Sequence, residues 1–138
     1  MAHRCSVLIV DDDTELREVL QVALAAEGFG VATAANGRDA LDHLRSTADT
    51  CVILLNLMMP VMDGAQFRAA QLRDRSLAWI PTVIISGAVD AGPKARALRA
   101  TLFVRKPMDL DEVRQALRQI GCARSTSQKP RREHRARA

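Results

Sequence analysis

The chain has 138 residues, of which 48% are hydrophobic and 26% charged, an ordinary composition for one globular domain. No apolar run approaches the roughly 20 residues of a membrane-spanning helix, and the N-terminal residues lack a signal-peptide pattern. The net charge of +4 is concentrated in residues 124–138, which carry six basic residues and one acidic residue, so the remainder is close to neutral.

The three cysteines are an odd number and lack CxxC spacing, which favours small thiols over disulfides or metal ligands. They are Cys5, Cys51 and Cys122. We expect no membrane association and a reducing, cytoplasmic setting.

Short apolar runs rich in Val and Ile predict buried strands of a parallel sheet. These runs cover residues 7–10, 30–34, 51–55, 82–85 and 102–104.

Segments of helical period separate the runs. Thr14 is expected to cap the first helix, and Gly28 to end it. Its predicted apolar face consists of Leu16, Val19, Leu20, Ala23 and Leu24. Further helices are expected after the Asn36-Gly37 turn, over 65–74, from Pro93 to about Arg99, and after a cap at Asp109 or Asp111.

This alternation predicts an α/β fold of the (βα)5 type, with a five-stranded parallel sheet and helices on both faces. Residues 1–120 form the expected domain. Residues 121–138 lack large apolar side chains after the first positions and are expected to be a disordered basic tail, too short for a DNA-binding helical module.

Polar residues follow four of the predicted strands. Asp11-Asp12-Asp13 follows the first, Asn56 the third, Ser86 the fourth and, after one Arg, Lys106-Pro107 the last. Ligands of open α/β sheets bind beyond the carboxyl ends of the strands, so these groups predict one shared polar pocket.

Together with the segment Asn56-Leu57-Met58-Met59-Pro60-Val61-Met62-Asp63-Gly64, this set closely resembles the receiver domain of two-component response regulators over residues 5–120. The resemblance implies a flavodoxin-like fold and a phosphorelay signalling role rather than an enzyme. It assigns Mg²⁺ binding to Asp11, Asp12, the residue at 56 and the main-chain carbonyl of Met58. It assigns phosphoryl contact or switching to Ser86, Gly87, Phe103, Lys106 and Pro107.

The departure from the family lies at position 56, where the phosphoaccepting Asp is replaced by Asn56. A carboxamide oxygen is neutral and a far weaker nucleophile than a carboxylate, so phosphorylation there is not expected. Mg²⁺ binding should weaken, since this ion prefers anionic oxygens. The chain could be a natural variant that no longer uses phosphorylation, or an engineered Asp-to-Asn form of an ordinary receiver.

A second departure is Arg99-Ala100, where the family usually has Gly-Ala. A helix end without that glycine predicts a short or irregular fourth helix. The expected output face, formed by the fourth helix, last strand and last helix, is also the expected surface for a homodimer.

The expected partners are a sensor histidine kinase, a phosphotransfer protein or a downstream effector protein, contacted by a stand-alone receiver module. The alternative is a nucleic-acid-associated adaptor acting through the basic tail. The DxD at Asp11 and Asp13 also occurs in aspartyl-nucleophile phosphatases, but Glu15 stands where that motif has Thr or Val.

Overall fold

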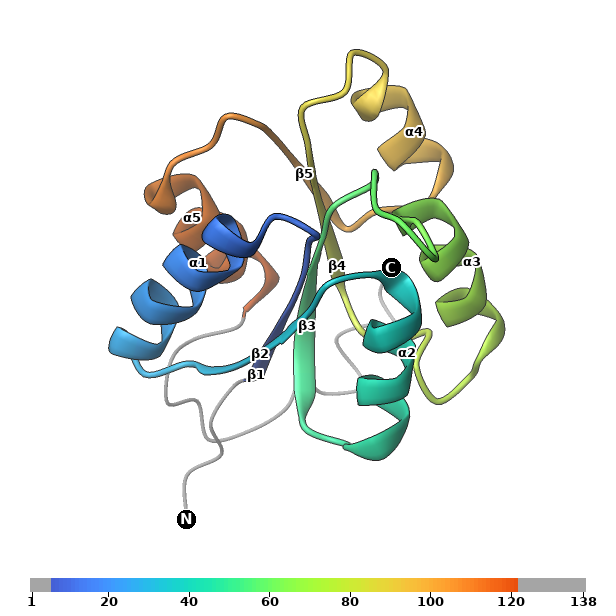
Figure 1. Ribbon diagram of the computed structural model, residues 1–138, viewed down its shortest axis with the longest axis horizontal. Helices are drawn as coiled ribbons and strands as arrows, with labels where there is room; N and C mark the ends of the chain where they lie inside the picture. The colour runs from blue at the N-terminus through green and yellow to red at the C-terminus, as the bar shows by residue number, and fades with distance from the viewer. Residues whose placement is uncertain (1–5, 122–138) are drawn as a thin grey trace.

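The computed structural model describes residues 6–121, which form one five-stranded parallel sheet with the strand order β2-β1-β3-β4-β5. Helices α1 and α5 cover one face of the sheet, and α2, α3 and α4 cover the other (Figure 1). This is the predicted flavodoxin-like (βα)5 fold. The strands are β1 (Ser6–Val10), β2 (Gly30–Ala34), β3 (Thr50–Leu55), β4 (Thr82–Ser86) and β5 (Leu102–Arg105). The helices are α1 (Thr14–Ala26), α2 (Gly37–Ser46), α3 (Gly64–Arg73), α4 (Ala91–Ala97) and α5 (Leu110–Ile120).

Strand β1 shows why these apolar runs become central strands. Val7 and Ile9 point to one face and pack with α1 and α5, while Leu8 and Val10 point to the other. All four side chains are at most 1% exposed. In a strand that is covered on both faces, an apolar residue at every position is buried and stabilises the fold, which explains the continuous apolar run.

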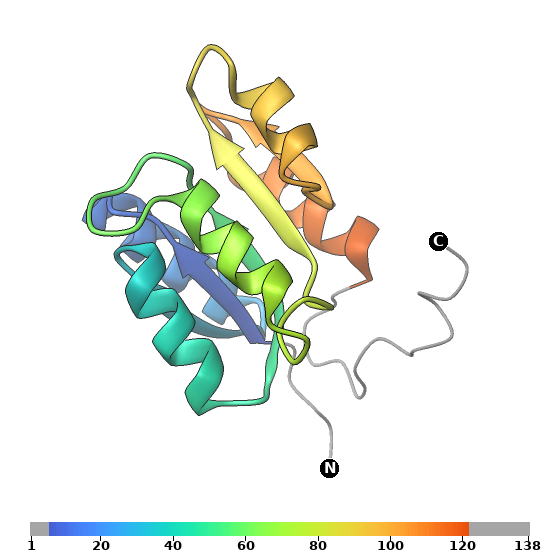
Figure 2. The same cartoon turned by 90° about the vertical axis from the view of Figure 1, so that its right-hand side faces the viewer.

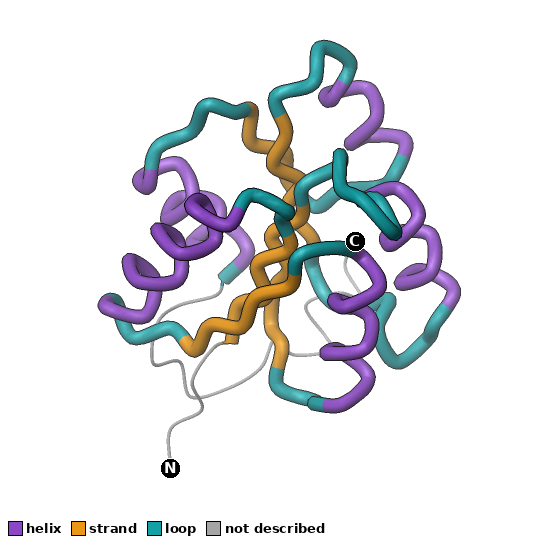
Figure 3. The backbone as a smooth tube through the Cα atoms, viewed as in Figure 1, coloured by secondary structure: helices purple, strands orange, loops and turns teal. Residues whose placement is uncertain are grey.

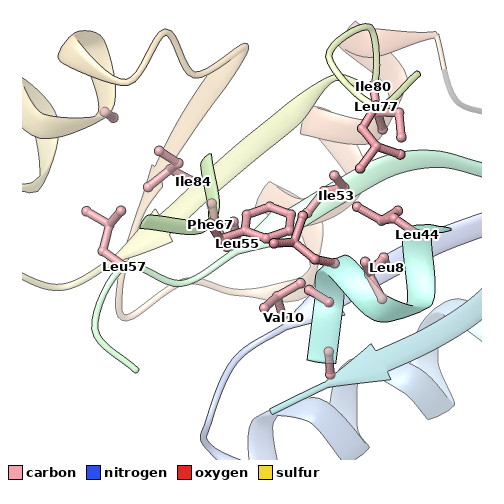
Figure 4. Close-up of a cluster of buried hydrophobic side chains, with 14 of the residues drawn as sticks. Leu8, Val10, Leu44, Ile53, Leu55, Leu57, Phe67, Leu77, Ile80 and Ile84 are labelled. Atoms are coloured by element: carbon pink, nitrogen blue, oxygen red, sulfur yellow. The ribbon is translucent and has the colours of Figure 1, made fainter. Parts of the chain in front are cut away.

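The second face of the sheet carries a cluster centred on Phe67 of α3, whose ring is fully buried (Figure 4). Leu55 from β3 and Ile84 from β4 lie beside it in the same cluster. Phe67 therefore packs α3 against β3 and β4 in the middle of the sheet.

Most helix boundaries follow capping chemistry. Asp63 and Asp109 each form a capping box, with Gln66 and Glu112 respectively. The predicted cap at Thr14 is wrong by one residue: the Asp13 carboxylate accepts from Leu16 N, and Thr14 is the first helical residue. Asp and Thr are both good caps, so sequence preference could not separate them.

The predicted apolar face of α1 is also partly wrong. Leu20 and Leu24 are buried, but Val19 is 61% exposed. Val19 lies about 100° round the helix from the buried Leu20, at the margin of the predicted apolar stripe, and its side chain points to solvent.

Helix α4 is short, as the missing glycine predicted, and Arg99 beyond its end has φ +59°. The carbonyls of Leu98 and Arg99 accept from the Arg68 guanidinium, at 2.9 Å from Nε and 2.7 Å from Nη2. Arg68 lies on α3 and is only 4% exposed. Burial lowers the pKa of Arg68, and the charge of Arg99 lowers it further. An arginine from a neighbouring helix thus satisfies carbonyls that the end of α4 leaves free.

The first and last described residues are Ser6, which starts β1, and Gly121, which caps the end of α5. The start of β1 and the end of α5 both lie at the amino ends of the strands, away from the loops that follow the strands (Figure 2). Cys51 is a buried free thiol, as predicted. Cys5, Cys122 and the predicted basic tail lie outside the described residues.

Candidate functional site

Polar side chains meet beyond the carboxyl ends of β1, β3 and β5, and we refer to this group as the polar pocket. The loops that follow these strands lie in the upper part of Figure 3. There Lys106, which follows β5, reaches Asp11, which follows β1, and Asn56, which follows β3. These groups meet because parallel strands bring their carboxyl ends to one edge of the sheet.

Asp11 is the most constrained side chain of the pocket. Its Oδ2 lies 2.9 Å from Lys106 Nζ, and its Oδ1 accepts from Asp13 N at 3.0 Å. Its main-chain carbonyl accepts from the Arg17 guanidinium at 2.7 Å. The Asp11 side chain is 5% exposed and that of Lys106 25%, so their ion pair is largely shielded from solvent.

Asn56 lies at the centre of the pocket and is 7% exposed. Its Nδ2 donates to the Met58 carbonyl at 2.8 Å and to Asp12 Oδ1 at 3.3 Å. Its Oδ1 accepts from Lys106 Nζ at 3.4 Å. The nitrogen of the carboxamide therefore has partners in the loops after β1 and β3, and its oxygen has a partner in the loop after β5.

Two glycines hold the loop between β3 and α3 against the pocket. A Cβ at Gly64 would come within 2.5 Å of the Asn56 carbonyl oxygen, and a Cβ at Gly37 within 2.9 Å of the Met62 carbonyl oxygen. Gly37 N donates to that same Met62 carbonyl at 2.8 Å. Only glycine permits these approaches without displacement of the backbone.

Val61 occupies the tip of this loop with φ +68°, and Met62 N donates to the Pro60 carbonyl at 2.7 Å across it. This is the hydrogen bond of a three-residue γ-turn. A β-branched residue at positive φ is rare, and Val61 is 77% exposed, so no packing of its side chain explains its presence.

Ser86 is 1% exposed and its hydroxyl accepts from Ala88 N at 3.2 Å, which fixes the start of the loop between β4 and α4. The Ala88 carbonyl accepts from the Arg105 guanidinium at 2.9 Å. Arg105 also lies 5.3 Å from the centre of the Phe103 ring, in a cation–π contact. Phe103 is half-buried and packs against the cluster below α4.

The structure therefore joins one subset of the predicted residues in a continuous hydrogen-bond network: Asp11, Asp12, Asn56, the Met58 carbonyl and Lys106. Gly87 lies against Lys106: a Cβ built at Gly87 would be 3.3 Å from the Cβ of the lysine. Pro107 follows a cis peptide bond and is exposed. Sequence reasoning missed Arg17 and Arg105, because both bind main-chain carbonyls and neither belongs to a recognisable motif.

Comparison with known proteins gives the family of the chain. Residues 7–118 match the response regulator receiver domain family. The chain is 31% identical over 136 residues to the transcriptional regulatory protein CseB of Streptomyces avermitilis, covering 94% of this chain and 56% of that protein. It is 35% identical over 113 residues to the regulatory protein AtoC of Escherichia coli K12, covering 78% of this chain and 23% of that protein.

Solved structures show the same likeness. The chemotaxis response regulator CheY4 of Vibrio cholerae has a TM-score of 0.78 at 27% identity, covering 85% of this chain and 98% of that one. This chain belongs to the response regulator receiver domain family of two-component signal transduction, whose members are signalling modules rather than classical enzymes. It spans about half the length of CseB and about a quarter of AtoC.

Receiver domains bind Mg²⁺, and the fold neighbour TrrA of Thermotoga maritima was solved in complex with Mg²⁺ and BeF (TM-score 0.74, 22% identity, 84% of this chain and 98% of that one). The donor set here does not fit that ion as arranged. Asn56 turns its nitrogen, not its oxygen, toward Asp12 and Met58, and Asp11 is paired with Lys106. Within residues 6–121, no three or more His, Cys, Asp or Glu side chains are grouped to hold a metal ion.

Proposed function

We propose that this chain is a receiver module that acts by protein–protein contact and is not phosphorylated at position 56. The supporting observation is the place of Asn56. It follows β3 and lies between Lys106 on one side and Asp12 and Met58 on the other. This is the position that the family resemblance assigns to the acceptor Asp, but a neutral carboxamide oxygen cannot form the acyl phosphate.

The second part of the proposal is that Mg²⁺ binds more weakly than in an ordinary receiver. Before the Asn56 oxygen could face a cation beside Asp12, the carboxamide would have to rotate and give up its present hydrogen bonds. The pocket also has one formal negative charge fewer than it would with Asp at position 56.

Receiver domains interact with histidine kinases and effectors. For this chain we propose a sensor kinase, a phosphotransfer protein or an effector protein as partner, in the cytoplasm. A homodimer could use the α4-β5-α5 face, where Phe103, Arg105, Glu112 and Gln115 contribute to a shallow depression of about 220 Å³. No helix within residues 6–121 is long and apolar enough to cross a membrane.

The test is labelling with acetyl phosphate and Mg²⁺, read by a phosphate-retarding gel and intact mass. The parent protein should remain unlabelled, and Asn56→Asp should gain an acid- and base-labile phosphoryl group. Asn36→Asp is the matched control, because Asn36 caps α2 outside the pocket and should gain nothing. Labelling of the parent at any pocket residue, Ser86 included, would refute the proposal.

A further inference from the structure

The orientation of the Asn56 carboxamide follows from the chemistry of its neighbours. The Met58 carbonyl and the Asp12 carboxylate can only accept hydrogen bonds, so the atom 2.8 Å and 3.3 Å from them must be the amide nitrogen. The Lys106 ammonium can only donate, so the atom 3.4 Å from Nζ must be the amide oxygen. Rotation of the carboxamide by 180° would place its oxygen against the Met58 and Asp12 oxygens and its NH₂ group against the Lys106 ammonium.

The two acceptors of the amide nitrogen come from separate loops. Asp12 follows β1, and Met58 lies in the segment between β3 and α3. Both are oxygens that a divalent cation would draw together, and both face the Asn56 NH₂ group instead. Its two hydrogens carry partial positive charge, one for each acceptor.

We propose that the Asn56 carboxamide replaces the divalent cation of this pocket. This inference rests on the proposed function, since it assumes a receiver pocket altered at position 56. The NH₂ group joins the Asp12 and Met58 loops as a metal would, and the oxygen holds Lys106. The pocket keeps one arrangement in the absence of metal, and the amide opposes the entry of a cation.

This proposal and the simpler view of Asn56 as a weak metal ligand predict opposite results for one substitution. If Asn56 contributes a ligand oxygen, Asn56→Ala removes it and should weaken Mg²⁺ binding. If the NH₂ group occupies the cation's place, Asn56→Ala removes an obstacle and frees the Asp12 carboxylate and the Met58 carbonyl, while Asp11 keeps its ion pair with Lys106. Mg²⁺ binding should then improve, although the variant has one oxygen fewer.

The experiment compares Mg²⁺ binding by the full chain, Asn56→Ala and Asn56→Asp, using titration calorimetry with MgCl₂ and the Mg²⁺-induced shift of the unfolding midpoint. The expected order of affinity is Asn56→Asp, then Asn56→Ala, then the parent. Asn56→Ala should bind about tenfold or more tightly than the parent, since it has no charge-assisted amide hydrogen bond to lose. Asn36→Ala is the control for loss of an asparagine elsewhere and should match the parent.

A second measurement on the parent alone covers the case in which Asn56→Ala does not fold. The side-chain NH₂ resonances of Asn56 should exchange slowly with solvent and should not shift at millimolar MgCl₂. Stronger Mg²⁺ binding by the parent than by Asn56→Ala, or a saturable shift of those resonances, would overturn the inference. Phosphoryl labelling of the parent would instead refute the proposed function, so the two failures are distinguishable.

Discussion

The Nζ of Lys106 lies 2.9 Å from Oδ2 of Asp11, although β3 and β4 separate their strands in the sheet. The lysine reaches across the pocket to this carboxylate, and its Nζ also donates to the Asn56 oxygen at 3.4 Å. Lys106 is thus engaged within the protein, and its ion pair joins the loop after the edge strand β5 to the loop after β1.

Lys106→Met should lower the free energy of unfolding by about 1–3 kcal/mol, because it leaves the buried Asp11 carboxylate without its cation. The double variant with Asp11→Asn should recover part of this loss. Urea unfolding of the parent, both single variants and the double variant gives the coupling energy. A coupling close to zero would show that the pair does not stabilise the fold.

Asn56→Asp should lower stability in EDTA by about 0.5–2 kcal/mol, within the usual range of single substitutions. The new carboxylate would set an oxygen against the Met58 carbonyl and the Asp12 carboxylate, where the NH₂ group now donates. Added Mg²⁺ should restore part of the loss, since it binds only the folded state. Asn36→Asp serves as control: it adds a carboxylate beside Asp39, away from Asn56, so added Mg²⁺ should not restore any stability that it loses. Unchanged midpoints for Asn56→Asp in EDTA would contradict the argument.

Arg99→Gly should stabilise the protein by about 0.5–1 kcal/mol, because glycine adopts the φ of +59° without steric penalty. Arg99→Ala separates the two contributions: it removes the positive charge near Arg68 but keeps the Cβ. Thermal unfolding of both variants should rank glycine above alanine. The reverse order would show that backbone strain at this position is negligible.

Arg68→Met should destabilise by about 2–4 kcal/mol, since it removes the donors to the carbonyls of Leu98 and Arg99 and to Gln71 and Thr82. Arg73→Met on the exposed side of the same helix should stay within about 0.5 kcal/mol of the parent. Similar losses in both variants would argue against a special role for the buried guanidinium. Denaturant midpoints and the hydrogen exchange of α4 amides measure the effect.

Val61→Gly should leave stability unchanged or raise it by up to about 1 kcal/mol, despite the loss of a large side chain. The reason is the positive φ of an exposed β-branched residue. Val61→Ala retains the Cβ and should gain less. A loss on substitution by glycine would indicate that the Val61 side chain makes a stabilising contact.

The sequence was sufficient for the five parallel strands, for their alternation with helices and for the polar residues that follow the strands, because apolar runs and the polar groups after them are local signals. Asp11, Asn56 and Lys106 could be assigned to one edge of the sheet without coordinates. The direction of the Asn56 amide could not, since it depends on acceptors that meet only in the folded protein. Arg68 was missed for a similar reason: a buried arginine on α3 looks like any surface arginine until the end of α4 lies against it.

The start of β1 and the end of α5 lie at the amino ends of the strands, opposite the loops that carry Asn56 and Lys106, and this has a practical consequence. A fluorescent protein, an affinity handle or a surface-immobilisation tag joined directly to Ser6 or to Gly121 would sit away from Asn56. Such fusions can therefore report on partners that approach the pocket side without standing in their way. Tethering through Ser6 or Gly121 would likewise present the pocket side of the domain to the partner in solution.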